Sequence, residues 1–364
     1  MVKEIPSLFP NERSPVLITG PCSVESEEQI HQAAKEIAQG HVPSALRGGI
    51  WKPRTRPNGF EGIGEQGLRW LREAAESIGT VPITEVANAQ HVELALKEGF
   101  RHLWVGARTT TNPFSVQEIA DSLNGSSVTV LVKNPINPDL KLWIGALERI
   151  EGAGIHQVAA VHRGFSVYRD SVYRNIPMWE IPIALMAERP ELPILCDPSH
   201  IAGNREMISF VSQKALDLNM DGLMIESHPD PEHAKSDPQQ QLKPSRLSEM
   251  LRSLSVRKEH VEDFEFENKL EELRNIIDEI DTEILQKIAH RMSVIEKIGE
   301  YKRENEVTIL QMERWKEILQ TRGDLATALL LDQKFVHEFL ELVHQFSIQK
   351  QTEIMNELES KKKG

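Results

Sequence analysis

The sequence has few cysteines, no long apolar run and no excess of basic residues, and each absence excludes a class of protein. Two cysteines in 364 residues are too few for a disulfide framework, so each is expected to be a free thiol or a metal ligand. No apolar run approaches the roughly 20 residues of a membrane span, and no secretory leader is recognisable. A formal net charge of -13 argues against a nucleic-acid binder. We therefore expect a cytoplasmic protein that binds neither membrane nor nucleic acid.

Short β-branched runs recur at intervals of about thirty residues from residue 16 onward. They begin at Val16, Ser44, Val81, His102, Val128, Gln157, Pro193 and Asp221. Segments with helical periodicity lie between them, for example 27–38, 65–78, 139–151 and 205–218. Eight such units over roughly 240 residues predict an α/β fold of the (β/α)8, or TIM barrel, class.

An open doubly wound sheet is the main alternative, and its signature is a glycine-rich turn directly after the first strand. The stretch Gly62-Ile-Gly-Glu-Gln-Gly67 matches that pattern. It lies about ten residues beyond the second predicted strand, however, and we interpret it as a loop that enters a helix.

The character of the chain changes after Leu254, where glycine and proline nearly vanish and the density of charge rises. We predict a barrel domain at 1–255, a linker at 256–268 and an all-helical domain at 269–364. Apolar residues step by threes and fours for about thirty residues from Leu270, which is longer than most globular helices. Two further helical segments, 309–322 and 331–357, complete a three-helix unit that is expected to dimerise to bury its apolar seam.

Residues able to bind a divalent cation follow three of the predicted strands. Cys22, His200, Glu226 and Asp237 offer a thiolate, an imidazole and two carboxylates. Barrel active sites are built at the carboxyl ends of the strands, so these side chains are expected to converge on one mouth and to hold a Lewis-acidic ion. The alternative is a buried thiol, a capping histidine and two surface acids.

Five cations follow the strands of the same predicted barrel, although the protein as a whole is acidic. They are Lys52, Arg54, Arg108, Lys133 and Arg163. Arginine binds phosphate and carboxylate through a two-pronged guanidinium, so this group indicates a ligand with more than one anionic group. Solvated charges at the strand ends are the alternative.

Six ordered motifs give a specific resemblance over residues 14–245. They are Gly20-Pro-Cys-Ser-Val-Glu25, Leu46-Arg-Gly-Gly49, Lys52-Pro-Arg-Thr55, Gly106-Ala-Arg108, Asp197-Pro-Ser-His200 and Glu226-Ser-His-Pro229, with Lys235-Ser-Asp237 after the last. The segment resembles the short-chain type I beta class of 3-deoxy-D-arabino-heptulosonate 7-phosphate synthases. The related 3-deoxy-octulosonate 8-phosphate synthases differ where this chain reads Lys-Pro-Arg-Thr, which favours erythrose 4-phosphate over arabinose 5-phosphate as the aldose.

The resemblance implies roles for these residues. A divalent metal ion, Mn²⁺ in the first place with Fe²⁺, Co²⁺ or Zn²⁺ as alternatives, would be held by Cys22, His200, Glu226 and Asp237. Arg108, Lys133 and Arg163 would bind phosphoenolpyruvate, and Arg54 with Thr55 would bind the phosphate of erythrose 4-phosphate. Lys52 would lie between the substrates as a proton donor, so that Lys52, Cys22 and His200 form the catalytic group. Thr109 and Asn134 stand where relatives usually carry asparagine and a basic residue.

The helical domain resembles the all-helical chorismate mutases over about residues 268–357. The residues that carry the resemblance are Arg274, Arg291, Lys302, Arg314, Ser347 and Gln351. Such a pocket would bind the chorismate dianion in its compact conformer and rearrange it to prephenate. Arg291 and Lys302 share one face of a helix, whereas Arg274 lies about 25 Å away along it. We therefore expect Arg274 to complete the site of the other subunit in a homodimer.

Gln311 and Trp315 stand where such mutases often have acidic residues that bind the substrate hydroxyl. The chain is thus expected to be bifunctional, with a synthase and a mutase activity in aromatic amino acid biosynthesis. Two alternatives remain open: the helical domain acts mainly as an allosteric sensor and oligomerisation module, or the barrel makes the eight-carbon sugar acid. Prephenate or chorismate is expected to inhibit the barrel, and truncation near residue 256 is expected to abolish that inhibition.

Overall fold

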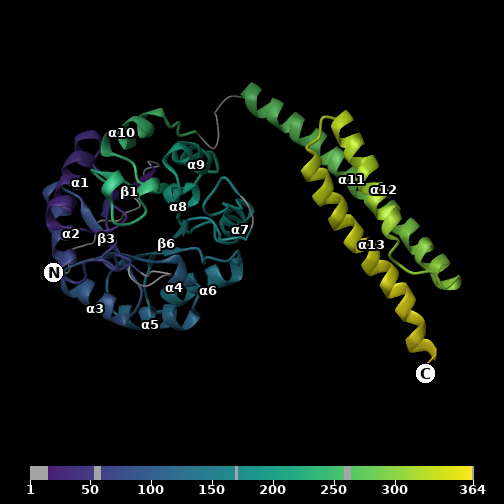
Figure 1. The fold of residues 1–364 in the computed structure, drawn as a ribbon, viewed down its shortest axis with the longest axis horizontal. Coiled ribbons are helices and arrows are strands. Elements are labelled where there is room, and N and C mark those ends of the chain that lie inside the picture. The colour runs from purple at the N-terminus through teal and green to yellow at the C-terminus, as the bar shows by residue number, and fades with distance from the viewer. Residues whose placement is uncertain (1–14, 53–58, 169–170, 258–263, 363–364) are drawn as a thin grey trace. The chain divides into compact units, whose positions relative to one another are not determined.

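The computed structural model describes residues 15–52, 59–168, 171–257 and 264–362. The chain divides into two compact units, Met1–Glu259 and His260–Gly364, which we call the barrel unit and the helical unit (Figure 1). Within the described ranges, no helix is both long and apolar enough to cross a membrane.

Eight parallel strands close the barrel unit into a ring in the order β1 to β8. The strands are β1 Val16–Gly20, β2 Ala45–Arg47, β3 Val81–Val86, β4 His102–Val105, β5 Thr129–Lys133, β6 Gln157–His162, β7 Ile194–Cys196 and β8 Gly222–Glu226. The ring closes where β8 pairs with β1, in a register that joins Gly20 to Glu226. The predicted TIM barrel is confirmed, and every β-branched run of the sequence analysis contributes a strand.

Helices form the outer layer of the barrel unit and surround the strands in Figure 1. They are α1 Glu27–Gly40, α2 Gln66–Ser77, α3 Ala89–Lys97, α4 Ala107–Thr110, α5 Pro113–Leu123, α6 Leu140–Gly152, α7 Glu180–Glu188, α8 Pro198–Ala202, α9 Arg205–Asp217 and α10 Pro244–Ser253, with the 3-10 turns Pro231–His233 and Pro238–Gln240. Several helices begin at a residue whose side chain accepts a hydrogen bond from a backbone N–H of the first turn, as at Ser26, Asn88, Asp139 and Asn204. Such caps satisfy amide groups that have no partner within the helix.

The glycine-rich stretch that could have indicated a dinucleotide site is a loop entering α2. Gly62 and Gly64 have positive φ angles, 102° and 77°, and Gly67 is already in the helix. A Cβ atom on Gly62 would lie 2.1 Å from the carbonyl oxygen of Ile50. Close backbone approach and left-handed geometry therefore explain the glycines without a ligand.

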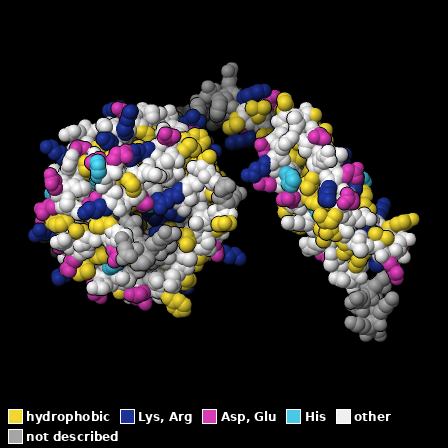
Figure 2. Space-filling model, in the orientation of Figure 1, with side chains coloured by type: hydrophobic (Ala, Val, Ile, Leu, Met, Phe, Trp, Pro, Cys, Tyr) yellow, Lys and Arg dark blue, Asp and Glu magenta, His cyan; other side chains and the backbone are white. Residues whose placement is uncertain are grey.

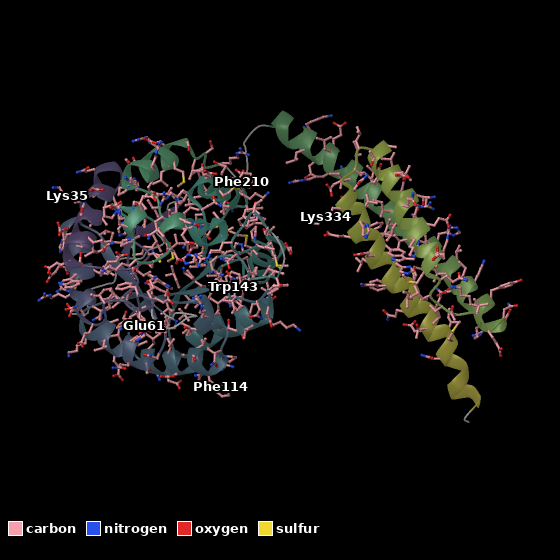
Figure 3. All side chains as sticks on the ribbon, in the orientation of Figure 1. Lys35, Glu61, Phe114, Trp143, Phe210 and Lys334 are labelled. Atoms are coloured by element: carbon pink, nitrogen blue, oxygen red, sulfur yellow. The ribbon has the colours of Figure 1, made fainter. Side chains whose placement is uncertain are left out.

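The apolar core lies in two layers, one between strands and helices and one inside the barrel. In the outer layer Trp143 is fully buried, whereas Phe114 on α5 and Phe210 on α9 lie at the outer surface (Figure 3). The inner layer fills the barrel with Val16, Ile18, Ala45, Ile83, Trp104, Leu131, Ala159, Val161, Leu195 and Met224. A barrel packed in this way has no open pore, so its site must lie at the mouth.

The helical unit consists of α11 Phe264–Glu304, α12 Met312–Ala328 and α13 Gln333–Lys362. Both α11 and α12 pack against α13. The helix α11 begins at Phe264, before the start expected near Leu270. Phe266 stands four residues before Leu270, so the apolar spacing of the helix already begins ahead of the expected start. Many apolar side chains of α11 are exposed in the single chain, among them Ile277 at 56% and Ile280 at 50%.

Candidate functional site

A ring of chemically active residues follows directly from the packing of the barrel interior. Side chains alternate along a strand, so the residue two positions beyond an interior residue also points inward. The residues that stand two positions further along the chain than those of the inner apolar layer are Gly20, Arg47, Glu85, Gly106, Lys133, Arg163, Asp197 and Glu226. The top of the barrel core is therefore a layer of charge, and Figure 2 shows basic side chains gathered in the hollow at the centre of the barrel.

Trp104 forms the floor beneath this charged layer. Its indole Nε1 donates a hydrogen bond to Glu85 at 3.0 Å. The guanidinium carbon of Arg47 and the Nζ atom of Lys133 lie 5.0 and 5.6 Å from the centroid of the ring. An aromatic face attracts cations, so Trp104 supports two buried charges that would otherwise be costly.

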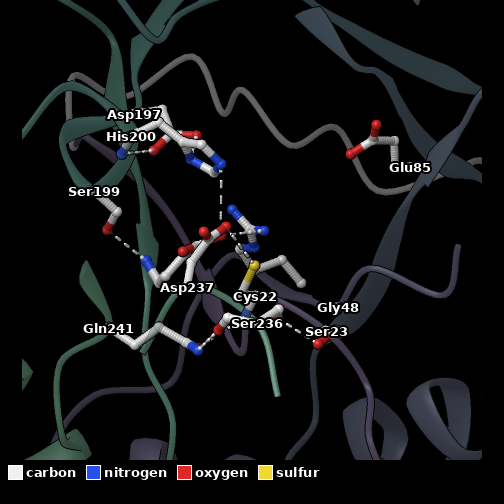
Figure 4. A network of polar contacts seen from close by, with 12 residues as sticks. Cys22, Ser23, Gly48, Glu85, Asp197, Ser199, His200, Ser236, Asp237 and Gln241 are labelled. Atoms are coloured by element: carbon white, nitrogen blue, oxygen red, sulfur yellow. Dashed lines mark hydrogen bonds and ion pairs between the residues drawn. The ribbon is translucent and has the colours of Figure 1, made fainter. Parts of the chain in front are cut away.

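Three of the four predicted metal ligands come together at the mouth. Ligand atoms of Cys22, Glu226 and Asp237 all lie within 4.8 Å of one another. The Cys22 Sγ atom is 3.4 Å from Oδ2 of Asp237, and Figure 4 shows the two side chains side by side with His200 above them. His200 is not in that close set, but its Nε2 atom lies 3.8 Å from Oε1 of Glu226.

The electrostatics of this group suit a cation. Burial, followed by the charge of Glu226, raises the pKa of the Cys22 thiol to about 12, so a bound cation is needed to make it a thiolate near neutral pH. Burial lowers the pKa of His200, which keeps the imidazole neutral and able to bind a metal. A thiol, a neutral imidazole and two carboxylates form a donor set that fits a divalent transition-metal ion.

Buried partners hold the two carboxylates in position. Nη2 of Arg47 donates to Oε1 of Glu226 at 2.9 Å, and Nε2 of Gln240 donates to Oε2 at 2.7 Å. Arg174 donates to Oδ1 of Asp237 at 2.9 Å. Burial opposes the charge of Asp237, but Arg174 and His200 outweigh it and hold the pKa of this carboxyl at about 2.

Asp197 links the metal-ligand group to the cations. Its Oδ2 atom lies 2.6 Å from Nζ of Lys133 and 2.8 Å from Nδ1 of His200, and its Oδ1 accepts the backbone N–H of His200. Burial opposes its charge, but His200 and Lys133 outweigh burial and hold the pKa of Asp197 well below its usual range. A single buried carboxylate therefore orients one residue of each group.

The cations line a cavity of about 500 Å³ at the mouth of the barrel. Its walls include Lys52, Arg108, Lys133, Arg163, Arg174, His200 and Asp237. Nη1 of Arg163 donates to Asn175 at 2.7 Å, and the backbone N–H of Arg163 donates to Oδ1 of Asn134 at 2.7 Å. Burial, with like charges at Arg174 and Arg108, lowers the pKa of Arg163 to about 10, so it remains a cation at neutral pH. The cavity is suited to an anion.

Lys52 lies between the two groups. Its Nζ atom donates to Sγ of Cys22 at 3.1 Å, and it also lines the cavity. Burial opposes its charge, but the thiolate form of Cys22 and the carboxylate of Glu226 outweigh burial and raise the pKa of Lys52. A Cβ atom on Gly49 would lie 2.7 Å from Nζ of Lys52, so this glycine leaves the space that the lysine occupies.

Sequence reasoning missed several residues of the site. Arg54 and Thr55 lie outside the described residues. Arg47 and Asp197 stood in motifs but were given no role, and Glu85, Arg174 and Asn175 were not considered. The alternation of inward and outward side chains along the strands predicts that Arg47, Glu85 and Asp197 point into the barrel. Arg174 and Asn175 lie in the loop after β6, where no such alternation exists.

The helical unit brings some of its predicted residues together. Nη1 of Arg291 on α11 donates to Oγ of Ser347 on α13 at 2.7 Å, and Gln351 lies one turn further along α13. Lys302 donates to the carbonyl of Ile309 at 2.6 Å. Arg274 and Arg314 instead pair with Glu271 and Glu317 on the surface of their own helices.

Two family models match the chain. The model described as the DAHP synthetase I family matches residues 9–263, and the model described as chorismate mutase type II matches residues 273–352. A phospho-2-dehydro-3-deoxyheptonate aldolase from Thermotoga maritima is 32% identical over 238 residues, which cover 65% of this chain and 68% of that protein.

Other relatives are more distant or are solved structures. A 2-dehydro-3-deoxyphosphooctonate aldolase from a Bradyrhizobium species is 27% identical over 267 residues, covering 68% of this chain and 88% of that protein. The crystal structure of the Thermotoga maritima DAHP synthase superimposes with a TM-score of 0.58 at 29% identity, over 65% of this chain and 67% of that one. A truncated form of the same enzyme gives a TM-score of 0.56 at 27% identity, over 65% of this chain and 84% of that one.

Proposed function

The chain belongs to the DAHP synthetase I family, and from that membership we propose how its two units act. The barrel unit condenses phosphoenolpyruvate with erythrose 4-phosphate to 3-deoxy-D-arabino-heptulosonate 7-phosphate and inorganic phosphate. The helical unit rearranges chorismate to prephenate. The observation that carries this conclusion is the presence of both family models on one chain, at 9–263 and 273–352.

The aldose is tested by a direct comparison of substrates. The synthase relative is 32% identical to this chain and the eight-carbon synthase relative is 27% identical, which supports erythrose 4-phosphate. Phosphoenolpyruvate consumption should be fast with erythrose 4-phosphate and slow with arabinose 5-phosphate. The reverse preference would assign the barrel to the eight-carbon reaction instead.

Phosphoenolpyruvate carries a phosphate and a carboxylate, and three cations of the cavity suit these groups. In our proposal Arg108, Lys133 and Arg163 bind the two anionic groups, with Asp197 orienting Lys133 and Asn134 fixing the backbone of Arg163. Arginine offers paired donors and lysine a point charge, so together they fix both the position and the direction of the enol carbon. Arg54 and Thr55 are proposed to bind the phosphate of the aldose.

The condensation forms one carbon–carbon bond and releases phosphate. The enol carbon attacks the aldehyde carbon, the aldehyde oxygen takes a proton, and water adds at the carbon that loses phosphate. We assign the proton donor to Lys52, whose raised pKa keeps it protonated at neutral pH and which lines the cavity beside Cys22. General acid catalysis requires such a donor within hydrogen-bond reach of the reacting oxygen.

The family is metal-dependent, and the donor set of the barrel mouth fits a divalent ion. Cys22, His200, Glu226 and Asp237 are proposed to hold it, with Mn²⁺ as the first candidate. When bound, the ion supplies Lewis-acid polarisation of the aldehyde oxygen. The residues around it keep its ligands oriented. Oδ2 of Asp197 lies 2.8 Å from Nδ1 of His200, which leaves Nε2 for the ion, and Arg47 donates a hydrogen bond to Glu226.

The mutase pocket is proposed to use residues from two copies of the chain. Arg291, Lys302, Arg314, Ser347 and Gln351 would bind the dianion, with Arg274 supplied by the second copy. The exposed apolar residues of α11, such as Leu273, Ile277 and Ile284, support a dimer because their burial is the usual driving force for pairing amphipathic helices. Light scattering of Ile277→Lys should report a monomer where the natural sequence gives a dimer or larger assembly.

Regulation of the entry reaction by a product of the attached mutase is the last proposal. The helical unit binds chorismate and prephenate. A ligand bound there changes the activity of the barrel only if the chain has two states that differ both in their affinity for the ligand and in the activity of the barrel. Prephenate should inhibit phosphoenolpyruvate consumption by the full chain and should leave a chain ending at residue 256 unaffected. Equal inhibition of both forms would exclude the helical unit as the sensor.

A further inference from the structure

One aromatic pair joins α12 and α13 beside the mutase residues. The rings of Trp315 and His344 are stacked face to face, with centroids 4.0 Å apart and an angle of 9° between their planes. Both side chains are half-buried. Because the indole covers one face of the imidazole, the plane of the imidazole is fixed and its ring nitrogens are directed along that plane.

His344 lies on the face of α13 that carries the mutase residues. Ser347 is three residues further on and Gln351 seven, so the three side chains share one face of the helix. Ser347 accepts the hydrogen bond from Arg291. Burial, followed by the positive charges of Arg291 and Lys302, lowers the pKa of His344. His344 is therefore a neutral imidazole near the two cations that are proposed to hold the dianion.

One nitrogen of this imidazole lacks a partner. The Nε2 atom of His344 is enclosed and makes no hydrogen bond with any residue that the structure describes. An enclosed polar nitrogen without a partner is costly, and native structures rarely retain one without a role. A neutral imidazole nitrogen can donate a hydrogen bond or accept one from a hydroxyl, depending on the tautomer.

The tryptophan at position 315 explains why the site needs another hydrogen-bond acceptor for the substrate hydroxyl. The all-helical mutases that this domain resembles often have acidic residues at the positions of Gln311 and Trp315, where they bind the substrate hydroxyl. An indole donates one hydrogen bond and has no acceptor, so Trp315 cannot accept the hydrogen of a substrate hydroxyl as a carboxylate does. Its ring instead stacks on that of His344, which places a neutral imidazole directly beside position 315.

We propose that Nε2 of His344 is the hydrogen-bond partner of the ring hydroxyl of chorismate, and that Trp315 is the positioning residue that fixes the imidazole plane. The inference rests on the mutase activity proposed above and adds a substrate contact to it. The alternative is that the stack of Trp315 on His344 only packs α12 against α13 and contributes nothing to recognition of the hydroxyl.

The test measures chorismate turnover by the full chain and by His344→Phe, with a chorismate analogue that lacks the ring hydroxyl as second substrate. Phenylalanine keeps a flat ring against Trp315 but has no nitrogen. The loss of one hydrogen bond should lower kcat/KM for chorismate by about tenfold and leave kcat/KM for the analogue unchanged. His344→Gln, which restores a polar group, should recover part of the loss, and Trp315→Phe should give an intermediate value.

A matched control is available on the same helix. His337 is half exposed and pairs with Glu341 on the surface of α13, so His337→Phe should leave both substrates unaffected. Far-UV circular dichroism and light scattering establish that each variant keeps its helices and its assembly state. If His344→Phe does not fold, the comparison of the two substrates is made with His344→Gln and Trp315→Phe.

The outcomes separate this inference from the function on which it rests. No turnover by the natural chain would contradict the mutase activity itself, and the inference with it. Normal turnover by His344→Phe, or an equal loss with chorismate and with the analogue, would overturn the inference and leave the mutase assignment intact.

Discussion

Replacing Asp197 by asparagine tests the link between the metal ligands and the cation cavity. The carboxylate is fully buried and lies 2.6 Å from Nζ of Lys133 and 2.8 Å from Nδ1 of His200. Asparagine keeps the shape but removes the charge, which leaves the Lys133 ammonium buried without its counter-ion. Removing one partner of a buried pair costs about 3 kcal/mol or more, and for a domain of this size that lowers the melting temperature by about 6–12 °C.

The same change should weaken both ligands of the barrel. The ring N–H of a metal-binding histidine usually donates to a carboxylate or carbonyl, and loss of such a partner lowers metal affinity by about 10- to 100-fold. Lys133 loses its orienting acceptor, so KM for phosphoenolpyruvate should rise by about tenfold or more. Calorimetry, metal titration and steady-state kinetics of Asp197→Asn measure the three effects.

Asp230→Asn is the matched control. Asp230 pairs with His233 three residues on, at 2.7 Å, as Asp197 pairs with His200, but both side chains are largely exposed. An exposed pair contributes at most about 1 kcal/mol, so the melting temperature should change by less than about 4 °C. The reasoning is refuted if Asp197→Asn melts within that range of the natural protein and binds metal and phosphoenolpyruvate normally.

Three further predictions concern single residues of the barrel unit. Because burial raises the pKa of the Cys22 thiol to about 12, metal binding must release a proton, and metal titrations should give an affinity that rises about tenfold per pH unit between about pH 6 and 8; a pH-independent affinity would exclude Cys22 as a thiolate ligand. Burial lowers the pKa of His162 to about 3, so the unfolded chain binds a proton that the folded chain does not, and stability should fall by about 1.4 kcal/mol per pH unit as the pH drops from about 6.5 toward 3. Urea denaturation should show that His162→Phe lacks this part of the slope, and an identical slope would count against a neutral buried imidazole. A Cβ atom on Gly106 would lie 2.1 Å from Oε1 of Glu85, whereas one on Gly145 would meet nothing within 4 Å. Gly106→Ala should therefore lower kcat of the synthase reaction by about tenfold or more, and Gly145→Ala should leave it unchanged. Equal rates for the two variants would mean that Glu85 moves aside without cost.

The sequence predicts the barrel well because its strands are short, buried on both faces and separated by regular amphipathic helices. All eight runs of β-branched residues became strands in the expected order. The start of α11 was placed too late, although Phe266 stands four residues before Leu270 in the same apolar spacing and could have indicated the earlier start. The charged residues that point into the barrel could also have been predicted, since each stands two positions after a residue of the inner apolar layer.

Pairings across the barrel could not be read from the sequence. Arg47 and Glu226 are 179 residues apart and meet only because β2 and β8 both flank β1 in the closed ring. Arg174 reaches Asp237 from a loop whose path has no regular pattern. The stack of Trp315 on His344 likewise depends on how two helices pack, which helical periodicity alone does not determine.

The most direct test of the account is phosphoenolpyruvate consumption with erythrose 4-phosphate by the full chain, before and after treatment with EDTA, and by Cys22→Ala. The account predicts that EDTA abolishes consumption, that added Mn²⁺ restores it in the natural protein, and that Cys22→Ala is not restored. Consumption that survives EDTA, or a Cys22→Ala variant as active as the natural protein, would contradict a metal-dependent synthase site built on Cys22.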